Sequence, residues 1–515
     1  MNQTPAGFGP PPEPFEPRSG GTSGAAGPRR GGRPRGRTAV VLAALVGVLL
    51  VIGGGAYLAA GGGRGEDGTG GKGAEDAAMP SRSPSVDQGD GKGPGGGPAA
   101  YDPNAGIQPG EARVWLRDNQ TELAGSGAEQ FGPWRVGDVV VKAMNKEVTG
   151  YAVADGQEKW KLALQTPLCG VPQAPSATGK LVVGLKESDS TTSQCTQLQQ
   201  IDLATGTAGW KVPLPQEKAH DASLQLEMAI SGDTVAVARS AVMSGVSVTD
   251  GRKLFGTSHT NGCSPHAFAG GSRLISLRNC FPPKEPASAA RSMVEELDPA
   301  TGASKWSHTY DAGWNVGRVL SVEPLVVAAY NTGKKTWNTT AFTADGKVRS
   351  QADAGFAVSG RCNGWGNSSG YQECYAAVAD ADTLYIGAGK PGENLGIEET
   401  VQVVAVDLNT GKEKWRTAEQ PEGRTMWPLA VEDGRVVVYV SPGSGETGSV
   451  VSLAPADGSA QPLLRSPAAA AGAEDVFYDH GVRISWAGGR LFLLNGRVVS
   501  PEPKVASRSI LSFGK

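Results

Sequence analysis

The chain has 515 residues, enough for several domains or for one large all-β assembly. Its formal net charge of −3 excludes the broad basic surface that binding to nucleic-acid phosphates requires. Its 74 Gly and 35 Pro residues are concentrated in the first hundred positions, which predicts a disordered N-terminal part and a packed body behind it.

The first 37 residues are rich in Gly, Pro and Arg and lack apolar periodicity, so residues 1–37 should form a disordered tail. Residues 38–60 contain no charged side chain and would span ~34 Å as a helix, which is long enough to cross a bilayer. Because the arginines precede this apolar run, the tail should stay in the cytoplasm and the body should lie outside. The sequence thus predicts a single-pass plasma-membrane protein whose partner through residues 38–60 is the bilayer itself.

A cleaved secretory signal is the alternative interpretation of the apolar run. Such signals usually have a shorter apolar core that lies nearer the N-terminus, and here 37 residues come first. Both interpretations export the body. Residues 61–108 are again rich in Gly, Ser and Pro and predict a flexible linker.

A repeated unit begins after the linker: an apolar strand, a turn that ends in Gly, and a further strand. Successive turn glycines are 44 to 65 residues apart, a spacing typical of four short strands per unit. Glycine suits such turns because it accepts the positive φ of a tight hairpin. Seven glycines take this position: Gly156, Gly206, Gly251, Gly302, Gly346, Gly411 and Gly458.

An aromatic residue follows most of these glycines by four positions, and we expect it to dock one unit against the next. The fifth and seventh units lack it and have Ser350 and Pro462 there. The aromatic residues are Trp160, Trp210, Phe255, Trp306 and Trp415.

The last unit is incomplete, because residues 489–494 and 509–513 read as strands with no outer strand after them. Residues 112–117 near the start of the body could supply that strand, with Trp115 in the docking position. Closing a ring in this way removes exposed sheet edges. The pattern therefore predicts an all-β, eight-bladed β-propeller over residues 109–515.

The repeat resembles the tryptophan-docking motif of the pyrroloquinoline-quinone-like (PQQ-like) β-propeller family, Ala-x-Asp-x-x-Thr-Gly-x-x-x-Trp. Ala405, Asp407, Thr410, Gly411 and Trp415 match it in full. Two further units match except at the first position, which is Gln200 in one and Glu296 in the other. The motif is specific for the fold and weak for activity.

The resemblance implies two classes of function. Some members are dehydrogenases that hold pyrroloquinoline quinone with Ca²⁺, and others are propellers that bind proteins. The dehydrogenases carry adjacent cysteines beside the quinone, whereas none of the six cysteines here are adjacent, and no Cys-x-x-Cys-His haem motif is present. No residue could be assigned as catalytic, quinone-binding or Ca²⁺-binding, so we expect no metal and no cofactor, with quinone and calcium as the alternative.

All six cysteines lie in the exported body, where disulfides persist. Short local loops favour the pairs Cys169–Cys195, Cys263–Cys280 and Cys362–Cys374 among the 15 connectivities. The alternative of a Zn²⁺ site at His259, Cys263, His266 and Cys280 has no recognised ligand spacing. The loop bounded by Cys362 and Cys374 has Trp365 at its centre, which makes it a candidate contact surface.

The sequence therefore predicts an extracytoplasmic binding or scaffold module rather than an enzyme. Its expected ligand is a protein, a component of the cell envelope or a small molecule, and nucleic acid is not expected. The alternative is a PQQ-dependent oxidoreductase tethered to the membrane.

Overall fold

A computed structural model describes residues 101–219, 221–239, 241–257, 262–281, 289–353, 370–372, 374–389, 401–421, 423–443, 446–478, 481–501 and 507–515. The chain divides into two units, Met1–Gly95 and Gly96–Lys515, and the described residues all belong to the second. None of their helices has the length and apolar character needed to cross a membrane. The predicted membrane span at residues 38–60 lies outside the described residues, as do the tail and most of the linker.

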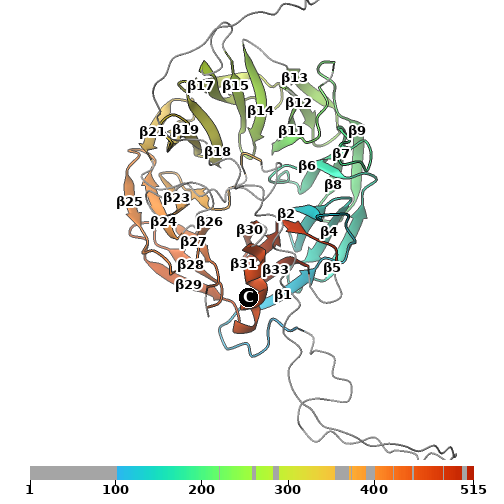
Figure 1. Cartoon of the computed structure of the whole chain (residues 1–515). Helices are drawn as coiled ribbons and strands as arrows, with labels where there is room; N and C mark the ends of the chain where they lie inside the picture. Colours follow the sequence, from blue (N-terminus) through green and yellow to red (C-terminus); the bar gives the residue numbers. More distant parts are fainter. Residues whose placement is uncertain are drawn as a thin grey trace, which may run out of the picture. The chain divides into compact units, whose positions relative to one another are not determined.

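The second unit is a ring of eight antiparallel sheets, each a blade of four strands with a short fifth strand added to the first blade (Figure 1). Blades 1 to 4 contain β2 (Ala128–Val136), β3 (Val139–Met144), β4 (Glu147–Ala152) and β5 (Glu158–Ala163); β6 (Leu168–Gly170), β7 (Lys180–Lys186), β8 (Cys195–Asp202) and β9 (Ala208–Pro213); β10 (Glu227–Ser231), β11 (Thr234–Arg239), β12 (Val242–Ser247) and β13 (Lys253–Thr257); and β14 (Cys263–Ala269), β15 (Leu274–Cys280), β16 (Arg291–Leu297) and β17 (Ser304–Thr309).

Blades 5 to 8 contain β18 (Trp314–Val322), β19 (Leu325–Asn331), β20 (Thr336–Phe342) and β21 (Val348–Asp353); β22 (Ala377–Ala379), β23 (Thr383–Ala388), β24 (Gln402–Asp407) and β25 (Glu413–Arg416); β26 (Met426–Glu432), β27 (Arg435–Val440), β28 (Ser449–Leu453) and β29 (Ala460–Arg465); and β30 (Val482–Ala487), β31 (Arg490–Asn495), β33 (Arg508–Gly514) and β1 (Arg113–Asp118). The strand β32 (Arg497–Val498) pairs with β2. Between β29 and β30 lie η3 (Ala468–Ala470), α1 (Ala471–Asp475) and η4 (Val476–Tyr478).

The eighth blade is completed by the first strand of the chain, as the sequence predicts. β1 pairs with β33 along its whole length, from Arg113 opposite Gly514 to Asp118 opposite Arg508. A salt bridge of 3.0 Å between the Arg508 Nη1 and the Asp118 carboxylate closes the far end of the pair. The N-terminal and C-terminal ends of the propeller thus form one sheet, which closes the ring and completes the last blade.

The ordered contacts begin upstream of the predicted boundary at residue 109. The Tyr101 hydroxyl donates a hydrogen bond of 2.8 Å to the Ala469 carbonyl. The Asn104 side chain exchanges two hydrogen bonds of 2.8 Å with the backbone of Val114. The last residues assigned to the linker, from 101 onward, are therefore held against blades 7 and 8.

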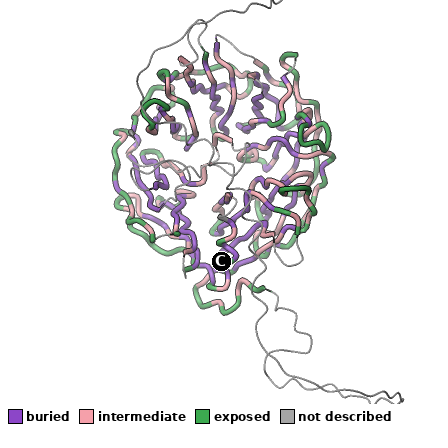
Figure 2. Tube along the Cα trace, viewed as in Figure 1, coloured by how far each residue is buried: buried purple, intermediate pink, exposed green. Residues whose placement is uncertain are grey.

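The hydrophobic core is divided among the joints between blades. Eight clusters of buried apolar side chains each join two consecutive blades, from the cluster around Trp134 and Leu181 (blades 1 and 2) to the cluster around Trp115 and Val140 (blades 8 and 1). Figure 2 shows the same distribution, with buried backbone inside the blades and exposed backbone at the outer rim. No single blade could bury both its faces alone, so the ring is the folding unit.

The docking aromatics and the turn glycines meet at these joints. All seven predicted glycines have positive φ, between +69° and +81°. Each aromatic ring covers the turn glycine of the next blade, so that a Cβ on Gly458 would lie 2.7 Å from the Trp415 ring. Trp115, Trp210 and Trp415 also donate an indole hydrogen bond of 2.8–2.9 Å to the carbonyl three residues before that glycine.

The fifth joint, which lacks an aromatic, keeps this hydrogen bond. The Ser350 hydroxyl donates to the Leu408 carbonyl at 2.7 Å, and Leu408 is three residues before Gly411. Serine therefore replaces tryptophan as the donor, while backbone of Gln351 occupies the space next to Gly411. Trp306 differs in another way: its ring covers Gly346, but its indole N–H donates to Glu296 of its own blade at 3.1 Å.

Two of the three predicted disulfides are formed in the described residues. Cys169 is bonded to Cys195 and Cys263 to Cys280. Cys374 is disulfide-bonded as well, and its predicted partner Cys362 lies outside the described residues. Because Cys263 and Cys280 are bonded to each other, they cannot act as thiolate ligands in the alternative Zn²⁺ site.

Candidate functional site

Two pockets lie between the first strands of the blades, near the centre of the ring. The first strands, among them β6, β18, β26 and β30, are the strands nearest the centre in Figure 1. One pocket has a volume of about 270 Å³ and is lined by β2, β6, β10 and neighbouring loops; we call it the acidic chamber. The other has a volume of about 370 Å³ and is lined by β2, β26, β30 and the segment before β22; we call it the aromatic chamber.

A short segment separates the two chambers. Residues 370–372, here called the strap, precede β22, and Gly370 and Gln372 line the acidic chamber. Two and three residues later, Cys374 and Tyr375 line the aromatic chamber. The long connection between blades 5 and 6 thus ends in the centre of the propeller and forms a wall of both pockets.

Hydrogen bonds fix the strap to blades 4 and 5. The Gln372 side chain accepts from the Gly270 N–H and donates to the Gly270 carbonyl, both at 2.8 Å. The Tyr371 carbonyl accepts from the Val319 N–H at 2.9 Å. The Tyr371 ring packs edge-on against His266 with the ring centroids 5.0 Å apart. These contacts hold the strap across the inner ends of two blades that it does not belong to.

The Tyr371–His266 contact is largely buried, and burial shifts both ionisation equilibria. Burial raises the pKa of the Tyr371 hydroxyl, with a further contribution from the nearby Glu227 carboxylate. Burial lowers the pKa of His266 to about 4, so this imidazole is neutral at ordinary pH. The Tyr371 ring of the strap and the His266 ring that it contacts are therefore both uncharged at ordinary pH.

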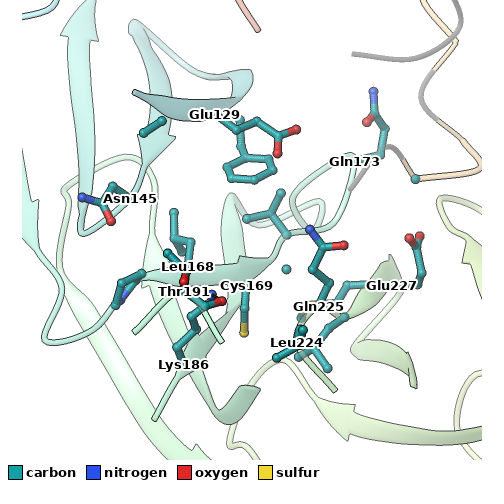
Figure 3. Close-up of a pocket in the computed structure, with 18 of the residues that line it drawn as sticks. Glu129, Asn145, Leu168, Cys169, Gln173, Lys186, Thr191, Leu224, Gln225 and Glu227 are labelled. Atoms are coloured by element: carbon teal, nitrogen blue, oxygen red, sulfur yellow. Dashed lines mark hydrogen bonds between the residues drawn. The ribbon is translucent and has the colours of Figure 1, made fainter. Parts of the chain in front are cut away.

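The walls of the acidic chamber combine apolar side chains with carboxylates and amides (Figure 3). Phe131, Leu168, Leu224 and Met228 are among the apolar lining residues, and Leu224 is 50% exposed. In Figure 3, the Glu129 carboxylate points from β2 toward the side on which Gln225 and Glu227 lie. The chamber thus has an apolar floor and polar groups on opposite walls, as ligand pockets commonly do.

The charges around the acidic chamber are arranged in pairs. Glu129 accepts from the Arg483 Nη2 at 2.8 Å, and the Arg483 side chain is only 1% exposed. Asp189 pairs with Lys146 at 2.9 Å on the surface. The Lys186 ammonium donates to the Thr191 carbonyl at 2.9 Å. Lys146 and Arg483 thus neutralise two of the three lining carboxylates, and Glu227 and Lys186 are the other charged residues of the lining.

The aromatic chamber is lined by rings and prolines. Trp134, Tyr375 and Trp486 contribute to its wall together with Pro133 and Pro428. The Trp134 indole N–H donates to the Gln173 carbonyl at 3.0 Å, and Gln173 lines both chambers. The two pockets are therefore adjacent, with a shared residue at their boundary.

The residues singled out from the sequence mostly lie elsewhere. The docking rings and turn glycines belong to the joints between blades, and none of them lines either chamber. Only Cys169 and Cys374 reach the acidic and the aromatic chamber, respectively. Sequence reasoning missed Glu129, Glu227 and the strap, because these residues are far apart in the chain and carry no local motif.

The acidic chamber does not suit the quinone that the family resemblance implies. Pyrroloquinoline quinone carries three carboxylates, which need cationic side chains or a Ca²⁺ ion with several oxygen ligands. The lining instead contributes three carboxylates of its own, and its one lysine donates to a backbone carbonyl. The described residues contain no group of three or more His, Cys, Asp or Glu placed to hold a metal ion. No chemistry of the quinone is therefore derived for this site.

Comparisons with known proteins find a family model that matches part of the propeller and solved structures of low sequence identity. Residues 99–262 match the family model described as outer membrane protein assembly factor BamB. BamB from Moraxella catarrhalis is 15% identical over 78% of this chain and 99% of its own, with a TM-score of 0.41. Quinohemoprotein alcohol dehydrogenase from Comamonas testosteroni is 11% identical over 79% of this chain and 76% of its own, with a TM-score of 0.44. None of the curated proteins matches the sequence.

Proposed function

We propose that the body of this chain, a PQQ-like β-propeller, binds segments of exported proteins in its acidic chamber while a single membrane helix tethers it to the plasma membrane. The chamber carries the proposal, because it combines an apolar floor with polar groups on a scaffold that eight inter-blade clusters make rigid. The matching family is described as an assembly factor for outer membrane proteins, which supports a protein as the ligand.

The size of the chamber favours a side chain or a short segment over a folded domain. A volume of about 270 Å³ is slightly below the range of ~300–1,000 Å³ typical of pockets for drug-sized ligands. Leu224 is half exposed beside the chamber and offers apolar contact area to the rest of an incoming chain. A peptide could thus place one residue inside and rest its neighbours on the rim.

Site-specific photocrosslinking tests the binding role. We expect benzoylphenylalanine at Leu224 of the full-length protein to give ultraviolet-dependent adducts in intact cells, which mass spectrometry would identify as peptides of exported proteins. The matched control is the same residue at Leu463, which is 38% exposed on the outer strand β29. Equal adducts at both positions would show that the chamber is not a preferred binding site.

The membrane anchor needs its own test, since residues 38–60 lie outside the described residues. The proposed topology places the arginine-rich tail in the cytoplasm and the propeller outside. Protease added to intact spheroplasts should digest the propeller and leave an epitope on residues 1–37 protected. Release of an intact propeller into the medium would instead support cleavage after the apolar run.

The alternative, a quinone-dependent oxidoreductase, is tested with the same full-length protein. Incubation with pyrroloquinoline quinone and Ca²⁺ should leave no stoichiometric chromophore after gel filtration. Dye reduction with alcohols or sugars by the loaded protein would replace the binding proposal with an enzymatic one.

A further inference from the structure

We propose that the acidic chamber selects an uncharged apolar side chain, such as a leucine or methionine of an extended protein segment, over charged side chains of either sign. The inference rests on the proposed binding role and adds the chemical class of the residue that enters. It is supported by the balance of charges around the chamber, by the apolar side chains of its floor and by the amide groups of its wall.

The charged groups of the lining leave no net charge for a ligand. Glu129 and Asp189 each form a salt bridge with a cationic side chain, at 2.8 Å and 2.9 Å. The other charged lining residues are Glu227 and Lys186, which have opposite signs. Glu227 has an interaction partner as well, and the Lys186 ammonium donates to a backbone carbonyl. An ion that enters would therefore lose its hydration without gaining a free counter-charge.

The floor of the chamber consists of apolar side chains that two glycines allow to approach closely. A Cβ on Gly170 would lie 2.8 Å from the Leu226 Cβ, and a Cβ on Gly184 would lie 2.7 Å from the Leu226 Cδ1. The Met228 sulfur lies 3.0 Å from the same position on Gly170. Leu226 and Met228 both line the chamber and are each 6% exposed. An apolar ligand group gains by burial against them, and the flexible thioether can adapt to side chains of different shape.

Amide side chains in the wall suit the backbone of a peptide. Gln173 and Gln225 line the chamber, and both side chains can be followed in Figure 3. Each amide can donate and accept, which matches the N–H and carbonyl groups of an extended chain. The Gln372 amide, in contrast, is already bonded to the backbone of Gly270. A hydrocarbon chain offers no groups for such contacts, so an apolar side chain with its flanking backbone is the better match.

Peptide binding to the full-length protein in lipid nanodiscs tests the selectivity. The probes are end-blocked pentapeptides, Gly-Ser-X-Ser-Gly, in which X is norleucine, alanine, lysine or glutamate, and binding is measured by isothermal titration calorimetry. We expect norleucine to bind at least about tenfold more tightly than alanine, because its longer side chain buries more apolar surface. Lysine and glutamate should also bind at least about tenfold more weakly than norleucine, because each brings an unpaired charge into the chamber.

The comparison of norleucine with lysine is decisive. The two side chains have the same aliphatic stem and differ only in the terminal ammonium, so equal affinity for these peptides would overturn the proposal. Binding of the norleucine peptide should also show a negative heat-capacity change and should not weaken with salt. A loss of affinity with rising salt would indicate a charge-based interaction and would overturn the proposal as well.

A variant that unbalances the charges tests the electrostatic step. Lys146→Met removes the partner of Asp189, and the fold should be retained because the Lys146 side chain is 41% exposed. The lysine peptide should then bind about threefold more tightly, a gain typical of one surface ion pair, whereas the norleucine peptide should be unaffected. The control is Lys159→Met, which breaks the exposed Lys159–Asp138 pair on β5. No gain in Lys146→Met, or an equal gain in the control, would show that the charge balance is not the source of the selectivity.

A charge at the mouth of the chamber locates the binding site. Leu224 lines the chamber and is 50% exposed, so Leu224→Asp places a carboxylate beside the bound side chain without removing a core residue. Affinity for the norleucine peptide should fall by about tenfold, whereas Leu224→Met should retain it. The control is Leu463→Asp on β29, where the leucine is 38% exposed. Equal losses in the two aspartate variants would indicate a general charge effect and overturn the assignment to the chamber.

The outcome separates this inference from the proposed function. Photocrosslinking at Leu224 responds to any ligand in the chamber, whereas the pentapeptide series responds only to the character of one side chain. Specific adducts at Leu224 with no preference for norleucine would retain the binding role and reject the apolar selectivity. Absence of both signals would reject both proposals.

Discussion

Two neighbouring joints of the propeller solve the same packing problem with different side chains. Between blades 6 and 7, Trp415 covers Gly458 and donates to the Pro455 carbonyl at 2.8 Å. Between blades 5 and 6, Ser350 donates to the Leu408 carbonyl at 2.7 Å and no ring covers Gly411. Both acceptors are three residues before the turn glycine. The two joints therefore share the hydrogen bond to this carbonyl, whereas backbone of Gln351 takes the place of the ring at the second joint.

The joint without a ring uses polar contacts in its place. Arg349 pairs with Asp382 at 2.6 Å and donates to the Asn409 side chain at 2.7 Å, so it links β21 to two turns of blade 6. This joint also adjoins the long connection that ends in the strap. An apolar cluster that includes Leu320 and Ile386 also joins these two blades, and the polar contacts add fixed distances between individual atoms.

Substitution of the turn glycine at the aromatic joint should have the largest effect. Gly458→Ala would place a Cβ 2.7 Å from the Trp415 ring in addition to straining a residue with φ +72°. We expect a loss of about 3 kcal/mol or more in the free energy of unfolding, measured by chemical denaturation. Gly434→Ala is the matched control in the same blade, because Gly434 has φ +70° and nothing within 4 Å of its Cβ position. It should lose only about 1 kcal/mol, the contribution of backbone strain.

Removal of the ring itself should be nearly as severe. Trp415 is 9% exposed, so Trp415→Ala leaves a cavity and should destabilise the fold by about 3–5 kcal/mol. Trp415→Phe keeps most of the apolar area and loses the hydrogen bond to the Pro455 carbonyl. Its loss of unfolding free energy should therefore be less than half of the loss in Trp415→Ala. Equal losses in the two variants would show that the hydrogen bond, and not the apolar area of the ring, stabilises the joint between blades 6 and 7.

The joint between blades 7 and 8 adds a dependence of stability on pH. Glu474 in α1 is completely buried and accepts from the Tyr439 hydroxyl at 3.1 Å, and burial raises its pKa to about 7. The folded state therefore holds a proton that the unfolded chain releases near pH 4.5.

The contribution of Glu474 is fully present below pH 4.5 and is lost as the pH rises to about 7. A shift of this size corresponds to about 3 kcal/mol between the two limits. The difference in unfolding free energy between the native protein and Glu474→Gln should change by about that amount over this range, because glutamine stays neutral. A constant difference would show that Glu474 does not titrate in the folded protein.

The smallest effect is expected at the joint without a ring. Ser350→Ala removes one hydrogen bond and should cost about 1 kcal/mol. Ser350→Trp should not restore an aromatic joint, because backbone of Gln351 already occupies the space beside Gly411. We therefore expect this variant to unfold at a lower denaturant concentration than the native protein. A stabilised variant would show that the joint can accept the ring after all.

The repeat could be predicted from the sequence because its joints require particular residue types at fixed spacing. A turn with positive φ requires glycine, as at Gly458. The ring that packs on this glycine comes from the preceding blade, where Trp415 follows the turn glycine by four residues. The closing strand was predictable because the last unit lacks an outer strand and Trp115 supplies the ring that packs on Gly156. The role of Ser350 was not, because a hydroxyl has no distinctive spacing and only the partner carbonyl of Leu408 gives it meaning.

The chambers could not be predicted because they depend on distances between blades. Glu129 and Glu227 are almost one hundred residues apart and line one cavity only because the ring brings β2 and β10 around the same centre. The strap reaches this cavity from the connection between blades 5 and 6 through two hydrogen bonds to Gly270. Neither the charge pattern nor the period of the repeat contains this information.

The closing pair of β1 and β33 constrains the order in which the protein can assemble. Asp118 and Arg508 are separated by 390 residues, so their salt bridge cannot form until nearly the whole chain has been synthesised. During synthesis β1 has no partner, so the backbone edge of this strand stays unpaired for that entire time. Contacts of such long range also slow the final folding step.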